Sequence, residues 1–187
     1  MERYKHIALI GKTRSGKDEV ARLLTELSYP HERVAFGDIM KEKFYDIFPQ
    51  YTGKPKPTKE IIMFGQSMRA INEDVWVNYL MGNIRAIQLF HDTYQIDRPV
   101  YVFTDVRQQN EYDACKELGC IMVKVNSGDA LRVGRMLAIG EQPSKEVLQA
   151  KTETDLDKFE ADEVINNNGT LEDLAHEVER LMIKLEG

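Results

Sequence analysis

The segment from residue 6 to residue 24 places a glycine-containing turn between a strand pattern and a helix pattern. Apolar residues up to Ile10 predict a short strand, and Leu23 and Leu24 belong to the expected buried face of a helix. Residues 11–18 between them read GKTRSGKD. A helix that begins directly after a strand offers unpaired N–H groups and the positive end of its dipole at the turn. Both favour an anion, so the segment predicts a phosphate-binding loop.

The residue types in this loop suit a polyphosphate. Gly11 lets the chain leave the strand sharply, Gly16 lets the backbone approach an oxygen closely, and Lys17 can reach the terminal phosphates. We expect Lys17 to be exposed, so that its removal would leave the fold intact. The alternative is a glycine-containing turn with a surface lysine. The residues expected to bind a nucleoside triphosphate here are Gly11, Lys12, Thr13, Arg14, Ser15, Gly16, Lys17 and Asp18.

Composition limits the remaining possibilities. A chain of 187 residues that is 42% hydrophobic can form one sizeable core but is short for two independent domains. The net charge of −6 and the pI near 5.3 argue against general binding to nucleic acid. No run approaches the ~18 apolar residues of a membrane span, so we expect a soluble, cytoplasmic protein without membrane partners. Cys115 and Cys120 lack the companions of a zinc site and are expected to be reduced packing residues.

The rest of the chain alternates strand and helix patterns. Strands are expected at residues 4–10, 33–36, 99–105, 121–125 and 163–165. Helices are expected from residue 17, after Gly37-Asp38, from Thr58, over about 73–91, up to Leu118 and after Thr170, which can cap the last one. This order predicts an α/β fold with an open, doubly wound sheet of five parallel strands, in which strand 99–105 neighbours the first strand.

Two segments interrupt this alternation. Residues 49–97 form an all-helical insertion, and residues 127–154 form a long, glycine-punctuated stretch without a clear strand. The second carries Arg132 and Arg135, and such a stretch between sheet elements is typical of a lid. The core of the single expected domain is then residues 1–48, 98–126 and 155–187.

Carboxylates and arginines follow the predicted strands, where ligands of such sheets bind. Asp105 can hold Mg²⁺ or merely cap the following helix, and Asp18 stands where such loops usually carry a Ser or Thr ligand. Asp18 can replace that ligand or only favour the helix N-terminus. Phosphoryl transfer mainly requires alignment and neutralisation of charge. The arginines available for it are Arg14, Arg69, Arg107, Arg132 and Arg135.

Five stretches together resemble a known family. They are GKTRSGKDEVA, VAFGDIMKEKF, PTKEIIMFGQSMRAINEDVWVNYL, VFTDVRQQNEYDACKELGCIMVKV and ETDLDKFEADEVINNNGTLEDL. In this order they resemble the phage-type deoxynucleoside monophosphate kinases of the P-loop nucleoside monophosphate kinase superfamily. The resemblance implies a five-stranded parallel core, a helical acceptor-binding insertion and a mobile lid. It also implies transfer of the γ-phosphoryl group of ATP to a (deoxy)nucleoside monophosphate, with Mg²⁺.

The resemblance also implies residue roles. Donor phosphates would be held by residues 11–18, and the donor base would lie at the turn from Asn166 to Gly169. The residues facing the acceptor would be Asp38, Lys41, Arg69 and Arg107. Arg132 and Arg135 would close from the lid. Together with the residue types discussed above, this predicts Lys17, Arg132 and Arg135 as catalytic residues and Asp18 and Asp105 as metal ligands.

Three other interpretations stay open at this stage. One is a related kinase that phosphorylates dephospho-coenzyme A or phosphomevalonate. Another is a P-loop ATPase that is not a kinase, and the third is a nucleotide-binding protein without catalysis. A hydrolase needs a residue that orients water, whereas the arginines of residues 127–154 favour a kinase. The expected partners are small-molecule nucleotides, and whether the chain forms a homodimer is left open.

Overall fold

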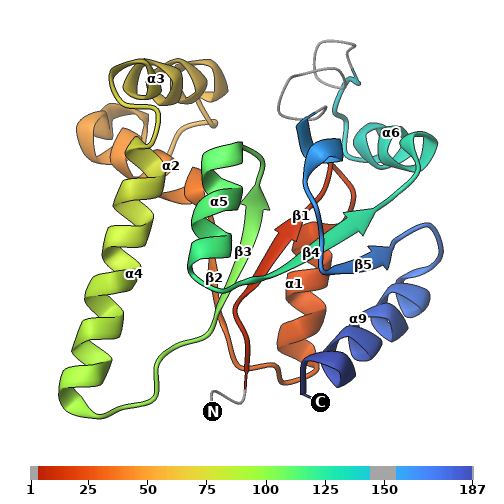
Figure 1. The fold of residues 1–187 in the computed structure, drawn as a ribbon. Coiled ribbons are helices and arrows are strands. Elements are labelled where there is room, and N and C mark those ends of the chain that lie inside the picture. The colour runs from red at the N-terminus through yellow and green to blue at the C-terminus, as the bar shows by residue number, and fades with distance from the viewer. Residues whose placement is uncertain (1–3, 144–154, 187) are drawn as a thin grey trace. The chain divides into compact units, whose positions relative to one another are not determined.

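The computed structural model describes residues 4–143 and 155–186 (Figure 1). The described residues form two compact units, and each is presented by itself. One contains the described residues up to Val34 and from Pro99 onward, and the other is Ala35–Arg98. The predicted helical insertion, residues 49–97, falls inside the second unit. Residues 144–154 of the predicted lid lie outside the described residues.

The first unit is built on five parallel strands in the order β2-β3-β1-β4-β5. The strands are β1 (Ile7–Ile10), β2 (Glu32–Val34), β3 (Tyr101–Val106), β4 (Ile121–Asn126) and β5 (Glu163–Asn166). This confirms the predicted doubly wound sheet and the pairing of β3 with β1. After β1 the chain adds β2 and β3 on one side of this strand and then β4 and β5 on the other. The turn after β1 therefore lies at the switch point, where such sheets bind ligands.

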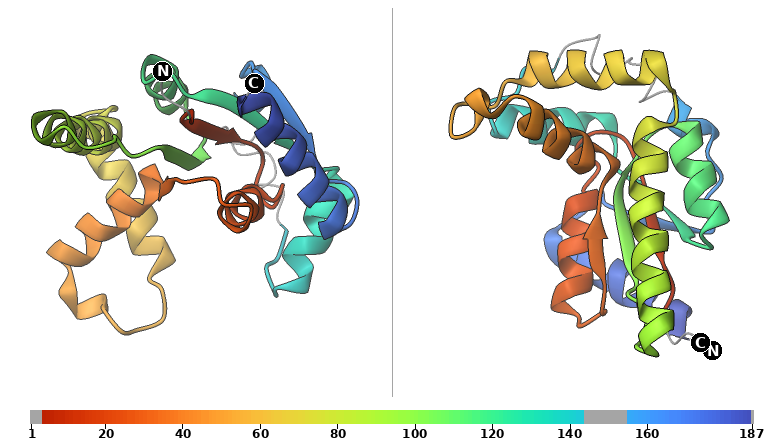
Figure 2. Two further views of the ribbon diagram at one scale, coloured as in Figure 1. Left: turned by 90° about the horizontal axis from the view of Figure 1, so that it is seen from below. Right: turned by 90° about the vertical axis from the view of Figure 1, so that its left-hand side faces the viewer.

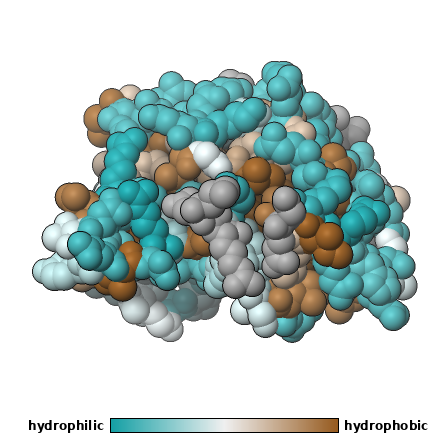
Figure 3. All heavy atoms as spheres, turned by 60° about the horizontal axis from the view of Figure 1, so that its bottom comes forward, coloured by the Kyte–Doolittle hydropathy of each residue, from teal (hydrophilic) through white to brown (hydrophobic). Residues whose placement is uncertain are grey.

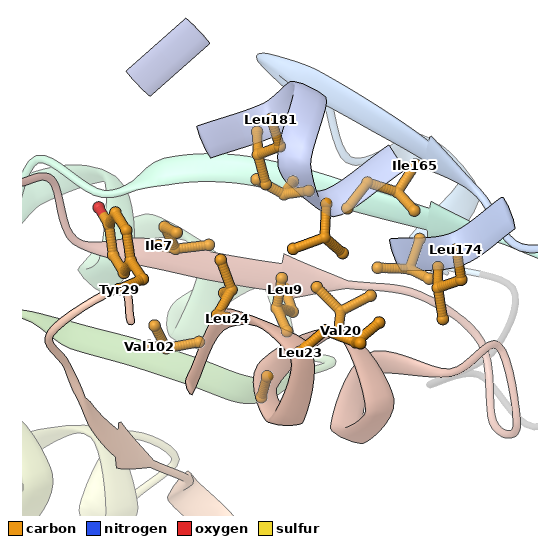
Figure 4. Close-up of a cluster of buried hydrophobic side chains, with 14 residues drawn as sticks. Ile7, Leu9, Val20, Leu23, Leu24, Tyr29, Val102, Ile165, Leu174 and Leu181 are labelled. Carbon is orange, nitrogen blue, oxygen red and sulfur yellow. The ribbon is translucent and has the colours of Figure 1, made fainter. Parts of the chain in front are cut away.

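Helices cover both faces of this sheet (Figures 1 and 2). Helices α1 (Lys17–Glu26) and α9 (Leu171–Glu186) pack on one face, and α5 (Gln109–Glu117) lies on the other. The period of two in β1 places Ile7 and Leu9 toward α1 and α9. There they meet buried leucines of both helices (Figure 4). Two further elements of this unit are α6 (Asp129–Ala138) and the short helix η2 (Asp155–Lys158).

Local signals account for the start of α9. The Thr170 Oγ atom accepts the N–H of Asp173 at 3.2 Å, and the Asp173 carboxylate accepts the N–H of Thr170 at 2.7 Å. This exchange satisfies two donors at the helix N-terminus and confirms the predicted cap. It also holds the pKa of Asp173 below its usual range, because the hydrogen bonds favour the charged form.

The second unit contains α2 (Phe36–Ile47), η1 (Pro49–Tyr51), α3 (Thr58–Ile71) and α4 (Val75–Tyr94). Its centre is aromatic: the ring of Phe64 lies 5.7 Å from those of both Phe44 and Trp76. A Cβ atom on Gly65 of α3 would lie 2.2 Å from the Met40 sulfur of α2. The glycine therefore leaves room for the Met40 side chain between these two helices.

The predicted boundary between the second strand and the following helix is wrong. The strand ends at Val34 and the helix begins at Phe36, rather than after Gly37-Asp38. Phe36, Met40 and Phe44 are spaced by four residues and therefore share one face of a helix. Phe36 is buried on this helix face. Its packing there favours helix over the longer strand that the local apolar run predicted.

The face shown in Figure 3 is mostly hydrophilic, and both cysteines are buried. Figure 3 shows one face of the molecule, with hydrophilic residues over most of it and hydrophobic residues in separate groups. Within the described part of the chain, no helix is long and apolar enough to cross a membrane. Cys115 and Cys120 are both buried and both free, as expected for packing residues.

The buried hydroxyl group of Tyr101 makes stability depend on alkaline pH. It has no hydrogen-bond partner among the described residues. Burial, with a smaller contribution from Glu32 on β2, raises the pKa of Tyr101 from 10.0 to about 12. The folded protein therefore keeps the proton at pH values where the unfolded chain loses it. The free energy of unfolding from this group is fully present below pH 10 and is lost as the pH rises to about 12.

We expect Tyr101→Phe to leave the free energy of unfolding at pH 8 unchanged or higher, and to reduce its decline above pH 10. The variant removes an unpartnered polar atom and the group that titrates. Urea denaturation across this pH range measures the effect. Tyr94→Phe, at an exposed position of α4, should keep the wild-type profile. An unchanged alkaline decline in Tyr101→Phe would contradict the assignment.

Candidate functional site

The turn between β1 and α1 has a backbone that depends on its two glycines. Gly16 has φ of +103°, and a Cβ atom there would lie 2.1 Å from the Nδ2 atom of Asn167. A Cβ atom on Gly11 would lie 2.6 Å from the Ser15 hydroxyl oxygen and 2.7 Å from the Val125 carbonyl oxygen. Gly11 is required by close packing, and Gly16 by both backbone conformation and packing.

Side chains from distant elements hold three consecutive carbonyl groups of this loop. The Arg132 guanidinium donates to the Thr13 carbonyl at 3.0 Å, and that of Arg135 donates to the Arg14 carbonyl at 3.2 Å. The Ser15 carbonyl accepts the Asn167 side-chain amide at 2.8 Å. In a trans peptide the C=O and N–H groups point in opposite directions. The N–H groups of Arg14 and Gly16 therefore face away from these partners, as an anion site requires, while the Ser15 N–H donates to the Lys12 carbonyl oxygen at 3.1 Å within the loop.

Lys17 begins α1 and is buried, with an exposed fraction of 7%. Its Nζ atom donates to the carbonyl oxygens of Gly11 at 2.6 Å and of Lys12 at 3.2 Å. The prediction of an exposed Lys17 is therefore wrong. The lysine folds back over its own loop because the two carbonyl oxygens partner its ammonium group and make burial of the charge tolerable.

Two other basic residues of the loop form exposed ion pairs. The Arg14 Nε atom donates to Glu141 at 3.0 Å, and this contact raises the pKa of Arg14. The Lys12 ammonium lies 2.9 Å from the carboxylate of Asp157 in η2. Arg14 and Lys12 therefore each form an ion pair with a carboxylate, Glu141 and Asp157, that the sequence did not indicate.

Both arginines predicted for the lid lie on α6 and contact the loop. Arg132 has an exposed fraction of 3%, and its guanidinium also donates to Asp129 at 2.9 Å, which lowers the pKa of that carboxyl. Arg135 also donates to the Ser127 hydroxyl at 3.1 Å. The structure thus brings these residues to the predicted phosphate loop, and their part in catalysis stays a prediction.

The residues present fit a polyphosphate with Mg²⁺. The Ser15 hydroxyl is buried in the loop without a hydrogen-bond partner among the described residues, and no side chain caps α1 at Gly16. Unpartnered donors of this kind suit phosphate oxygens. Asp105 is half-buried near the end of β3, and Asp18 is exposed in the first turn of α1. No group of three or more potential metal ligands occurs within the described ranges, but Mg²⁺ on phosphates needs only one or two carboxylates.

The residues predicted for the acceptor belong to both units. Arg107 follows β3 and donates to the Thr13 hydroxyl at 3.2 Å, which connects it to the loop. Its backbone N–H donates to the buried Glu111 at 2.9 Å, in the capping box of α5. In the second unit, Lys41 donates to Asp38 at 2.6 Å. Arg69 lies in the last turn of α3, and the grouping of all four residues around one ligand stays a prediction.

Asn167 contacts the loop, a role that the sequence did not indicate. It belongs to the turn from Asn166 to Gly169 predicted for the donor base, in which Asn166 and Gly169 are exposed, whereas Asn167 is 6% exposed and bonded to the loop. Alternation along β5 could have found it, since Ile165 is buried, Asn166 exposed and Asn167 buried. Whether Asn166 and Gly169 contact the donor base stays a prediction.

Comparison with known families decides the class of the protein. The family model described as deoxynucleotide monophosphate kinase matches residues 58–178, which is more than half of the chain. The chain belongs to this kinase family. The match includes Asp105, Arg107 and the arginines of α6, while the loop at residues 11–18 precedes it. Membership makes the protein a phosphotransferase, in agreement with the expected kinase, and sets aside an ATPase without an acceptor.

Solved structures share the fold of this kinase-family member. A Thermus thermophilus protein, TT1252, is 18% identical, with a TM-score of 0.58 over 100% of both chains. Shikimate kinase from Acinetobacter baumannii is 19% identical, with a TM-score of 0.52 over 98% of this chain and 95% of its own. Dephospho-CoA kinase from Campylobacter jejuni is 12% identical, with a TM-score of 0.52 over 97% of both chains. No curated protein sequence matches that of the chain.

We expect Lys17→Ala to lower the free energy of unfolding by about 1 to 3 kcal/mol, because two loop carbonyl groups lose a charged donor. Urea denaturation measures this change. Lys158→Ala, which removes an exposed lysine of the same unit, should change stability by less than about 0.5 kcal/mol. Equal stability of Lys17→Ala and the wild type would show that these bonds contribute nothing to the fold.

Proposed function

We propose that the protein transfers the γ-phosphoryl group of ATP to the phosphate of a deoxynucleoside monophosphate. The observation that supports this most is the loop of residues 11–18, whose Thr13, Arg14 and Ser15 carbonyl groups are held by side chains of α6 and β5–α9. This geometry suits the donor triphosphate, and the family supplies the class of acceptor.

The proposed donor site works by alignment and neutralisation of charge. N–H groups of the loop and of the first turn of α1 bind the phosphates, and Lys17 exchanges its loop carbonyl groups for the terminal phosphate oxygens. Asp18 and Asp105 would hold Mg²⁺, which supplies positive charge to the donor phosphates when it is bound. Arg132 and Arg135 keep the loop in shape and place positive charge where negative charge spreads in the transition state.

The proposed acceptor site uses cations from several elements. Arg107, held beside the loop by Thr13, binds the acceptor phosphate. The family resemblance assigns the rest of the acceptor to Arg69 and to the Asp38–Lys41 pair, all of the second unit. An acceptor phosphate is already ionised near neutral pH, so its attacking oxygen needs no general base.

The identity of the acceptor that is phosphorylated distinguishes this function from that of other kinases. Purified protein with ATP and Mg²⁺ is incubated with each deoxynucleoside monophosphate, the matching ribonucleotides, dephospho-coenzyme A and phosphomevalonate. We expect ADP and a deoxynucleoside diphosphate in equal amounts, measured by chromatography. Phosphorylation of dephospho-coenzyme A or phosphomevalonate alone would overturn the proposed acceptor. ATP consumption that ignores every acceptor would overturn the proposed reaction.

We expect Arg132→Ala and Arg135→Ala each to lower kcat by about 10² or more, since removal of a group that stabilises transition-state charge typically has this effect. ATP affinity should fall less, because the lost support of one loop carbonyl affects donor binding only in part. Steady-state kinetics and calorimetry separate the two quantities. Arg180→Ala, on an exposed part of α9, is the matched control. A loss confined to ATP affinity would contradict a role in catalysis.

A further inference from the structure

Asn167 lies directly after β5, and its side chain reaches the predicted phosphate loop, residues 11–18. Its Nδ2 atom donates to the Ser15 carbonyl oxygen at 2.8 Å, across 152 positions in the sequence. Its Oδ1 atom and its backbone oxygen each accept an N–H of Arg135 at 3.1 Å. Its own N–H donates to the Asn126 carbonyl oxygen at 2.7 Å. Each polar group of the residue therefore has a defined partner.

These partners determine which way the side-chain amide points. The Ser15 carbonyl oxygen faces Nδ2, and the Arg135 guanidinium faces Oδ1. If the two side-chain atoms were exchanged, an acceptor would face an acceptor and a donor would face a donor. The amide is thus a directional connector: it donates to the loop and accepts from α6. An aspartate could keep the second contact but not the first.

The bond to Ser15 fixes one peptide group of the loop. Because this peptide is trans, holding its carbonyl oxygen toward Asn167 turns the N–H of Gly16 to the opposite side. Gly16 is the N-cap residue of α1, and no side chain caps this helix. The N–H that Asn167 orients is therefore at the position where a helix N-terminus binds phosphate.

Gly16 and Asn167 are also matched sterically. A Cβ atom on Gly16 would lie 2.1 Å from Nδ2, so any side chain at this position would push the amide off the Ser15 carbonyl oxygen. With φ of +103°, Gly16 has a conformation that other residues rarely adopt. The loop backbone and the asparagine therefore form one packed unit.

We propose that Asn167 is a positioning residue of the donor site, which holds the Ser15–Gly16 peptide so that the Gly16 N–H faces the donor phosphates. With Arg135 it connects the turn after β5, where the donor base is expected, to the phosphate loop. The inference rests on the proposed use of this loop for ATP. It assigns to Asn167 an action through the backbone, without contact to the base.

Binding of three probes separates this role from a contact to the base. The probes are ATP, inorganic tripolyphosphate and adenosine, titrated by calorimetry into the wild type, Asn167→Asp and Asn167→Ala. We expect both variants to bind ATP and tripolyphosphate about tenfold more weakly, which is the typical value of one misplaced hydrogen bond. Adenosine binding should not change. A loss for ATP and adenosine without a loss for tripolyphosphate would overturn the proposal in favour of a base contact.

A spectroscopic signature and a stability control exclude a merely structural effect. In the wild type the amide resonance of Gly16 should shift when tripolyphosphate is added, and in Asn167→Asp this shift should be reduced. Val178→Ala shortens a fully buried side chain of α9 and should lower stability while leaving all three affinities unchanged. Equal losses in Val178→Ala and Asn167→Asp would overturn the positioning role.

The same measurements distinguish this proposal from the proposed function. If the wild type transfers phosphoryl groups and Asn167→Asp binds tripolyphosphate with wild-type affinity, the positioning role fails and the kinase reaction stands. If the wild type transfers nothing to nucleoside monophosphates but the variant still loses tripolyphosphate affinity, the reaction fails and the positioning role stands. If the wild type binds neither ATP nor tripolyphosphate, both proposals fail.

Discussion

Three long-range hydrogen bonds to the backbone hold the loop of residues 11–18 in a conformation that is unfavourable for Arg14. Arg14 and Gly16 both have positive φ, of 62° and 103°, and for an arginine such a conformation is unfavourable. The compensating bonds come from Arg132, Arg135 and Asn167, which lie 119 to 152 positions away in the chain. The local shape of the loop is therefore a property of the whole first unit.

The strand order makes these contacts available. β4 pairs directly with β1 and β5 pairs with β4, so the segments that follow these three strands begin at one edge of the sheet. At that edge the Val125 carbonyl oxygen lies so close to Gly11 that only hydrogen fits between them. Helix α6 then follows β4, and the turn bearing Asn167 follows β5. The shape of the loop thus depends on close packing of three neighbouring strand ends.

This dependence explains which parts of the site the sequence could predict. The loop, its glycines and the arginines of α6 follow from local patterns, since residue type and spacing indicate each of them. Alternation along β5 indicates the face to which Asn167 points, but its contact with Ser15 and the burial of Lys17 depend on which strand ends become neighbours. The start of α2 at Phe36 was missed for a related reason, because burial on a helix face outweighed the local strand pattern.

The charges around the loop divide into two kinds with different consequences for an anionic ligand. The pair of Arg14 with Glu141 is exposed and that of Lys12 with Asp157 is partly exposed, and surface pairs contribute only about 0 to 1 kcal/mol. In the proposed donor site, a polyphosphate would therefore replace these carboxylates at little cost. The bond of the buried Arg132 to the Thr13 carbonyl oxygen involves neither of these carboxylates. In the proposed function, a chain with a net charge of −6 binds a highly charged anion here because the carboxylate partners of Lys12 and Arg14 are exchangeable, while Arg132 holds the loop backbone.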